Sequence, residues 1–163
     1  MTRNIIFIDV DGVLNTVKCL NNCLTVFKAH SCPCKPEYGI DDILRDRFIA
    51  FVNRCPENTQ FVLISSWRKE PTLLSLFKWT FNSIILKYAG YIDITKDEDR
   101  RHNSINRWLS NNITDHDYKY VIFDDREYTV PDFDNKGLKY NIEPYAGLSE
   151  LNCASAIVFF REP

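Results

Sequence analysis

Three short runs of the chain are apolar at nearly every position, and each leads directly into a polar side chain. A strand that is covered on both faces, as in a parallel sheet, has this unbroken apolar character. We therefore predict buried strands in these runs. They are Asn4–Asp9, Gln60–Ile64 before Ser65, and Tyr120–Phe123 before Asp124. Two weaker runs, Tyr91–Ile94 and Leu138–Ile142, predict further strands.

Four longer segments carry apolar residues three or four positions apart, the spacing of an amphipathic helix. At the start of the first segment, Asp41 or Asp42 can cap the helix. Strands that alternate with helices predict a parallel sheet covered on both faces, and ligands bind such sheets beyond the carboxyl ends of the strands. The predicted helices are Asp41–Val52, Thr72–Leu86, Ser104–Leu109 and Ser149–Phe160.

One connection breaks the alternation. Residues 15–40 form a link far longer than the usual loop of about 4–6 residues, and they hold four of the six cysteines. The link begins directly after Asp11 and Gly12, so we expect an insertion that lies over the site. The remaining spacing suits a single domain over residues 1–163.

Composition narrows the function classes. The chain is 45% hydrophobic and 26% charged, with a net charge of −2, so its overall field does not favour nucleic acid or a membrane surface. The first apolar run is too short for a signal peptide, and no stretch approaches the roughly 18–20 apolar residues of a membrane helix. We expect a cytoplasmic protein, in which cysteines are thiols or metal ligands before they are disulfides.

The segment Asp9-Val10-Asp11-Gly12-Val13 carries the chemistry. Asp9 ends a strand and can attack phosphorus, which splits the hydrolysis of a phosphate monoester into two easier displacements through an aspartyl phosphate. Asp11 can protonate the leaving oxygen and then deprotonate the attacking water. Gly12 permits a tight turn and a close approach of the backbone to a ligand.

Several carboxylates and a phosphate need a counter-charge in one pocket. Mg²⁺ is a hard cation that prefers oxygen ligands, and Asp124 and Asp125 follow another strand where they can complete its site. A calcium loop is the competing interpretation of the spaced acids. It needs glycine at its sixth position and glutamate at its twelfth, whereas Gly12 is fourth from Asp9 and Leu20 is twelfth.

Three motifs resemble those of the haloacid dehalogenase (HAD) superfamily of aspartate-nucleophile phosphatases. The resemblance implies a three-layer Rossmann-like fold with a central parallel sheet, and an insertion of this length implies a minimal cap. The motifs are IIFIDVDGVLN at Ile5–Asn15, FVLISSWR at Phe61–Arg68 and VIFDDR at Val121–Arg126.

Further residues resemble motifs of the subfamily named for the HAD domain of Swiss army knife RNA-repair proteins. That subfamily has a Ser/Thr-Ser/Thr-Trp triplet after the second strand, an arginine before an Ile-x-x-Trp-Leu helix, and a late Gly-Leu pair. In this chain they correspond to Ser65-Ser66-Trp67, Arg101 before Ile105–Leu109, and Gly147-Leu148.

The resemblance implies a role for each matching residue. Asp9 would be the nucleophile, Asp11 the general acid and base, and Ser65 a donor to the transferring phosphoryl group. Arg101 or Lys96 would offset the charge in the third motif, and we prefer Arg101 for its place beside a helix. The implied metal ligands are Asp9, the backbone carbonyl of Asp11, Asp124 and Asp125, and the substrate-binding candidates are Gly12, Ser66, Arg68 and Lys96.

The insertion leaves its own chemistry open. Four of its Cys and His side chains would make a tetrahedral Zn²⁺ site, but the spacing is not a familiar zinc pattern, and plain thiols or a disulfide are the alternatives. Phe27 and Tyr38 either stack on a base or pack the insertion against the body. We expect Trp67, Trp79 and Trp108 in the core. The candidate zinc ligands are Cys19, Cys23, His30, Cys32 and Cys34.

A minimal cap leaves the site open to a bulky substrate. The first prediction is a Mg²⁺-dependent phosphomonoester hydrolase that acts on a polynucleotide end or a nucleotide phosphate. The alternatives are a phosphatase of phosphoproteins or small metabolites, and a non-catalytic binding module with the same fold. The sequence contains no Gly-x-x-x-x-Gly-Lys loop, so we expect no fused polynucleotide kinase, and any repair role would need partners supplied separately. It does not indicate an oligomeric state.

Overall fold

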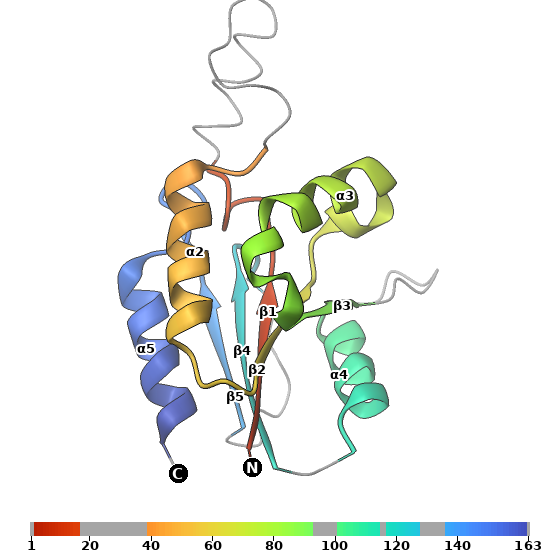
Figure 1. Cartoon of the computed structure of the whole chain (residues 1–163), viewed down its shortest axis with the longest axis vertical. Coiled ribbons are helices and arrows are strands. Elements are labelled where there is room, and N and C mark those ends of the chain that lie inside the picture. Colours follow the sequence, from red (N-terminus) through yellow and green to blue (C-terminus); the bar gives the residue numbers. More distant parts are fainter. Residues whose placement is uncertain (1, 17–38, 93–100, 115–116, 128–135, 163) are drawn as a thin grey trace, which may run out of the picture.

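A five-stranded, all-parallel sheet forms the centre of the computed structural model, which describes residues 2–16, 39–92, 101–114, 117–127 and 136–162. The strand order is β3-β2-β1-β4-β5, so the first strand lies in the middle (Figure 1). The predicted α/β architecture with a parallel sheet is confirmed. The strands are β1 (Arg3–Ile8), β2 (Thr59–Leu63), β3 (Tyr88–Tyr91), β4 (Tyr118–Asp124) and β5 (Gly137–Asn141).

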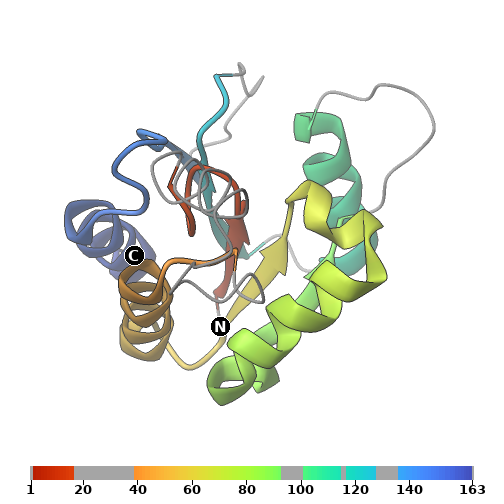
Figure 2. The same ribbon diagram turned by 90° about the horizontal axis from the view of Figure 1, so that it is seen from above.

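Helices cover both faces of this sheet and complete three layers. Helices α2, α3 and α5 pack on one face and α4 packs on the other (Figure 2). None of the helices in the described ranges has the length and apolar character needed to cross a membrane. The α-helices are α2 (Asp42–Arg54), α3 (Pro71–Thr80), α4 (Arg101–Asn112) and α5 (Glu150–Arg161), and the 3-10 helices are η1 (Ser66–Lys69) and η2 (Asn82–Lys87).

Strand β1 is buried on both faces, which explains its unbroken apolar run. Ile6 and Ile8 point into the cluster under α2, α3 and α5, whereas Ile5 and Phe7 point into the cluster under α4. Aromatic rings fill the first cluster, where Phe48 of α2 packs edge-on against its neighbours. Neighbouring positions of one strand therefore stabilise two separate cores.

Helix α2 begins where a polar side chain satisfies its free N–H groups. The Asp41 carboxylate accepts hydrogen bonds from the backbone N–H groups of Ile43 (2.9 Å) and Leu44 (3.2 Å). The structure thus selects Asp41, rather than Asp42, as the cap.

The single helix predicted over Thr72–Leu86 is wrong. The segment is split into α3 and η2, with a kink at which Ile84 leaves helical geometry. Phe77 and Phe81 remain buried across the break, but Trp79 is 63% exposed, so its predicted place in the core is also wrong. The polar pair Asn82-Ser83 lies at the start of the tighter turn, where weak helix formers favour a change of geometry.

Strand β3 lies three residues earlier than the predicted Tyr91–Ile94. Tyr88 and Tyr91 pair with β2, and the register shifts between them. Gly90 lies in this irregular stretch with φ of 98°, a conformation that other residues rarely adopt. The sequence pattern missed this strand because its residues are only partly buried and one of them is the glycine.

Candidate active site

The carboxyl ends of the three central strands bring the predicted polar residues together. Asp9 follows β1, Ser65 lies just beyond β2, and Asp124 is the last residue of β4. β1 and β4 are hydrogen-bonded neighbours, and the strand order reverses between them, so the chain leaves them in opposite directions. In open parallel sheets this switch point is where ligands bind.

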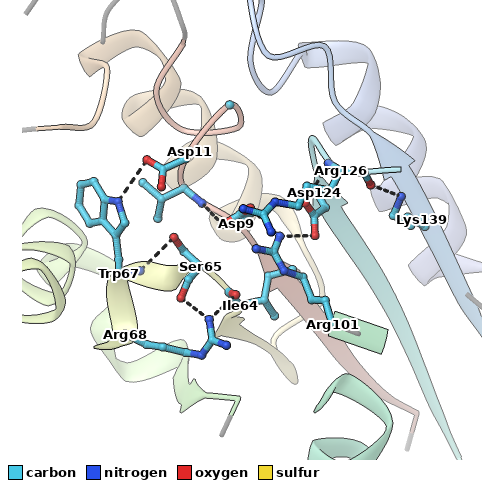
Figure 3. A network of polar contacts seen from close by, with 12 residues as sticks. Asp9, Asp11, Ile64, Ser65, Trp67, Arg68, Arg101, Asp124, Arg126 and Lys139 are labelled. Carbon is cyan, nitrogen blue, oxygen red and sulfur yellow. Dashed lines mark hydrogen bonds and ion pairs between the residues drawn. The ribbon is translucent and has the colours of Figure 1, made fainter. Parts of the chain in front are cut away.

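Arg101 connects the two carboxylates at the switch point. Its Nη1 donates to Asp9 Oδ2 at 2.6 Å and to Asp124 Oδ2 at 2.5 Å (Figure 3). All three side chains are largely buried, with 13% of the Arg101 side chain exposed, 4% of Asp9 and none of Asp124. Arg101 is the first residue of α4, so the start of this helix on the far face of the sheet delivers a cation to the site.

Burial and neighbouring charges together shift the pKa values of these groups. It raises the pKa of Asp9 to about 6, although the positive charge of Arg101 acts in the opposite direction. Burial disfavours the charge of Arg101, but Asp9 and Asp124 outweigh that effect and raise its pKa. Burial, followed by the charge of Asp124, also raises the pKa of Asp125. Three carboxylates therefore lie close together near Arg101, and Arg126 adds a second positive charge that acts on Asp125.

The same carboxylates fit a hard cation. Asp9, Asp124 and Asp125 each offer an oxygen, and these oxygens lie within 4.8 Å of one another. Two of the three residues are buried, so water offsets their repulsion poorly, and oxygen donors of this kind are those that Mg²⁺ prefers. The Asp11 side chain is not part of this group.

Gly12 brings the turn after β1 close to Asp125. Its φ is 78°, and a Cβ built on it would lie 2.6 Å from Asp125 Oδ2. Any larger residue would be strained in its backbone and would also collide with a candidate metal ligand. The substrate-binding role of Gly12 stays a prediction. Independently of that role, the close approach to Asp125 requires glycine at this position.

Asp11 lies on the same turn, and two side chains hold it. Asn15 Nδ2 and Trp67 Nε1 both donate to Asp11 Oδ1, at 3.0 Å and 3.2 Å (Figure 3 shows the Trp67 bond). Asn15 Nδ2 also donates to the carbonyl of Gly39 at 2.6 Å, so this side chain connects the two ends of the long insertion.

The family comparison agrees with this geometry. The family model described as "HAD domain in Swiss Army Knife RNA repair proteins" matches residues 5–153. The chain belongs to this family. The match begins inside β1 and ends inside α5, so it includes every described residue of the site. No curated protein and no solved structure matches the chain in the corresponding comparisons.

In this HAD domain the residues after β2 have different surroundings. Ser65 is fully buried, and its Oγ accepts from the Trp67 N–H at 3.3 Å as the cap of η1, which leaves the hydroxyl proton for another partner. Ser66 is exposed. Arg68 Nη1 donates to the carbonyls of Ile64 (2.7 Å) and Ser65 (2.5 Å), and these bonds fix the end of β2. A phosphate contact of Ser66 or Arg68 stays a prediction.

Several predicted residues lie outside the described ranges. Lys96, the alternative third-motif cation, is one of them, as are the aromatic residues Phe27 and Tyr38. The candidate zinc ligands Cys19, Cys23, His30, Cys32 and Cys34 also lie outside. Cys55 and Cys153 are described as free, buried thiols.

Sequence reasoning missed several residues that support the HAD domain's site. The Arg126 N–H donates to Asp124 Oδ1 at 3.1 Å, and Lys139 Nζ donates to the Arg126 carbonyl at 2.8 Å. Lys139 lies on β5 beside β4, so only the strand order reveals its position. Trp67 is in the core, as predicted, but its indole N–H also reaches Asp11. Asn15 ends the first motif, and the sequence predicted no role for it.

Proposed function

We propose that this HAD domain is a Mg²⁺-dependent phosphomonoester hydrolase that uses Asp9 as a covalent nucleophile. The observation that carries the proposal is the placement of Asp9 and Asp124 at the ends of adjacent central strands, with Arg101 Nη1 between them. An anionic phosphoryl group needs a carboxylate to attack it and cations to offset the combined charge. Family membership supports the same class of reaction.

The nucleophile acts first. An oxygen of the Asp9 carboxylate attacks phosphorus, the bond from phosphorus to the leaving oxygen breaks, and Asp11 donates a proton to that oxygen. The product is an aspartyl phosphate on Asp9 and a free alcohol. Ser65 would donate its hydroxyl proton to a phosphoryl oxygen, and the guanidinium of Arg101 would offset charge that spreads over the transferring group.

Water completes the cycle. Asp11, now a carboxylate, takes a proton from the water as it attacks phosphorus, and the bond to Asp9 breaks to release inorganic phosphate. Asp9, Asp124, Asp125 and the backbone carbonyl of Asp11 would hold the metal. When bound, Mg²⁺ supplies positive charge that offsets the carboxylates and the substrate phosphate.

For the substrate we propose a phosphate at a polynucleotide end or on a nucleotide. The support is the family's description, which names RNA repair proteins as the context of this domain. The alternative of phosphoprotein or small-metabolite substrates is separated from it by the same experiment, since the chemistry at Asp9 is common to all of them.

The test is phosphate release with Mg²⁺ and with EDTA. The substrates are p-nitrophenyl phosphate, oligonucleotides with a 3′- or 5′-phosphate, nucleotides, sugar phosphates and phosphopeptides. We expect turnover that needs Mg²⁺ and falls at least about 10³-fold in Asp9→Asn. Asp46→Asn is the matched control because it removes an exposed acid of α2 that is not one of the three clustered carboxylates. Turnover that survives Asp9→Asn would contradict the mechanism, and preference for phosphopeptides or sugar phosphates would contradict the substrate.

A further inference from the structure

We infer that Trp67 and Asn15 are positioning residues for Asp11. They hold one oxygen of its carboxyl group so that the other faces the leaving group. This inference rests on the proposed function, because it concerns the step in which Asp11 protonates the leaving oxygen.

Both contacts end on the same oxygen. Asn15 Nδ2 lies 3.0 Å from Asp11 Oδ1 and Trp67 Nε1 lies 3.2 Å from it. The indole N–H and the amide NH₂ group are both donors and cannot accept a hydrogen bond. The orientation of the Asn15 amide is fixed independently, because its Oδ1 accepts from the Gly12 N–H at 3.0 Å. With two donors on Oδ1, a proton carried by this carboxyl group belongs on Oδ2.

The two donors are themselves held in place. Asn15 is fully buried and Trp67 is 7% exposed, so water has little access to compete for their hydrogen bonds to Asp11. Trp67 follows the Ser65 cap of η1, which fixes its backbone. On its other side, a Cβ at Gly39 would lie only 2.9 Å from the indole carbon Cζ2, so the ring packs directly on this glycine backbone. The Gly39 carbonyl in turn accepts from Asn15.

This arrangement predicts an effect that depends on the leaving group. A phenolate that is a weak base leaves without much help, whereas a more basic leaving group depends on the acid. General acid catalysis contributes about 10²–10⁴-fold, and a small misplacement of a catalytic group can remove a large part of such a factor. Loss of one donor to Asp11 should therefore slow the substrate with the more basic leaving group selectively.

The experiment compares kcat/KM for p-nitrophenyl phosphate and phenyl phosphate, which differ little in shape but strongly in leaving-group basicity. The ratio kcat/KM reports steps up to departure of the leaving group, so release of phosphate from Asp9 does not mask the effect. Trp67→Phe keeps a buried ring and removes the N–H. We expect kcat/KM to fall about 10-fold for phenyl phosphate and less than about 2-fold for p-nitrophenyl phosphate.

Trp108→Phe is the matched control. Trp108 is also 7% exposed but packs edge-on against Phe7 on the α4 face of the sheet. This variant should change kcat/KM for both substrates by the same small factor. Gly39→Ala is the second variant, because it keeps the indole N–H but forces the ring to move, and it should reproduce the selective loss.

Two failures can be told apart. If turnover does not depend on Asp9, the proposed function is wrong and this inference falls with it. If turnover depends on Asp9 but Trp67→Phe and Gly39→Ala slow both substrates equally, or slow neither, then the positioning role alone is overturned. Thermal unfolding of each variant verifies that it is folded at the assay temperature.

Discussion

Strands β1 and β4 carry apolar side chains through their centres, at Ile5–Ile8 and Tyr120–Phe123, and carboxylates where they end. The apolar centres and the charged ends follow opposite principles. In these centres, aromatic and branched side chains are buried and pack against one another. At the carboxyl ends, the buried Asp9 and Asp124 and the partly buried Asp125 gather near the Arg101 guanidinium, and burial raises the pKa of Asp9 and of Asp125. The faces of the sheet therefore supply stability, whereas the carboxyl ends of the strands give up part of that stability for a reactive arrangement of charge.

The largest expected effect tests the apolar region. Phe48 is fully buried, with ring centroids 5.6 Å from Phe61 and 5.4 Å from Phe81, so Phe48→Ala should lower the free energy of unfolding by about 3–5 kcal/mol. Urea denaturation measures this change. Leu151→Ala is the control, since Leu151 is 78% exposed and should cost less than about 0.5 kcal/mol. Equal losses in the two variants would show that the buried ring of Phe48 stabilises the protein no more than an exposed side chain does.

Mg²⁺ tests whether the charged region is incomplete without a cation. At roughly 10–100 times its dissociation constant, Mg²⁺ should raise the free energy of unfolding by about 1–3 kcal/mol. Asp124→Asn should lose most of this gain, because Asp124 is a buried member of the three-carboxylate group. Asp46→Asn should keep it. Thermal unfolding with and without Mg²⁺ measures the gain, and an identical gain in Asp124→Asn would argue against this metal site.

Asp9→Asn should raise the free energy of unfolding in metal-free buffer, whereas the core substitution Phe48→Ala should lower it. The pKa of Asp9 is raised from 3.8 to about 6, so the native state is penalised wherever Asp9 is ionised. At pH 7 the gain should be about 1–2 kcal/mol. It should shrink as the pH falls from about 6 to 4, because the native protein then binds a proton at Asp9 that the unfolded chain lacks. Denaturation of both proteins across this range checks it, and a loss of stability in Asp9→Asn would contradict it.

The smallest effect concerns two thiols in the apolar region. Burial raises the pKa of Cys55 and of Cys153 from 9.0 to about 12. Above pH 9 the unfolded chain loses these protons first, so stability should fall as the pH rises, by about 0.5–1 kcal/mol per thiol at pH 9.5. The double variant Cys55→Ala/Cys153→Ala should show a shallower decline. An unchanged slope in that variant would assign the decline to other groups.

The sequence allowed prediction of what depends on local pattern. The apolar runs of β1, β2 and β4 are strong because both faces of each strand are covered, and their ends identified Asp9, Ser65 and Asp124. Parallel pairing then places these ends along one edge. The family's motifs added Arg101, whose position on α4 no periodicity would have connected to the acids.

Contacts between distant segments were beyond such reasoning. Trp67 was expected in the core from its size, and its hydrogen bond to Asp11 depends on the short 3-10 turn that aims the indole. The break between α3 and η2 falls at Phe81, where the apolar spacing continues through the sequence although the backbone leaves α-helical geometry. Both cases depend on geometry that a one-dimensional pattern does not contain.

The central place of β1 has a consequence for how the protein is made. Of the five strands, β1 is the first to leave the ribosome, yet it pairs with β2 (Thr59–Leu63) on one side and with β4 (Tyr118–Asp124) on the other. During synthesis its apolar residues stay without their strand partners until much later parts of the chain emerge, which leaves apolar surface exposed for that time. Asp9 meets Asp124 only after β4 emerges, so a truncated translation product that ends before this strand would lack the paired carboxylates of this site.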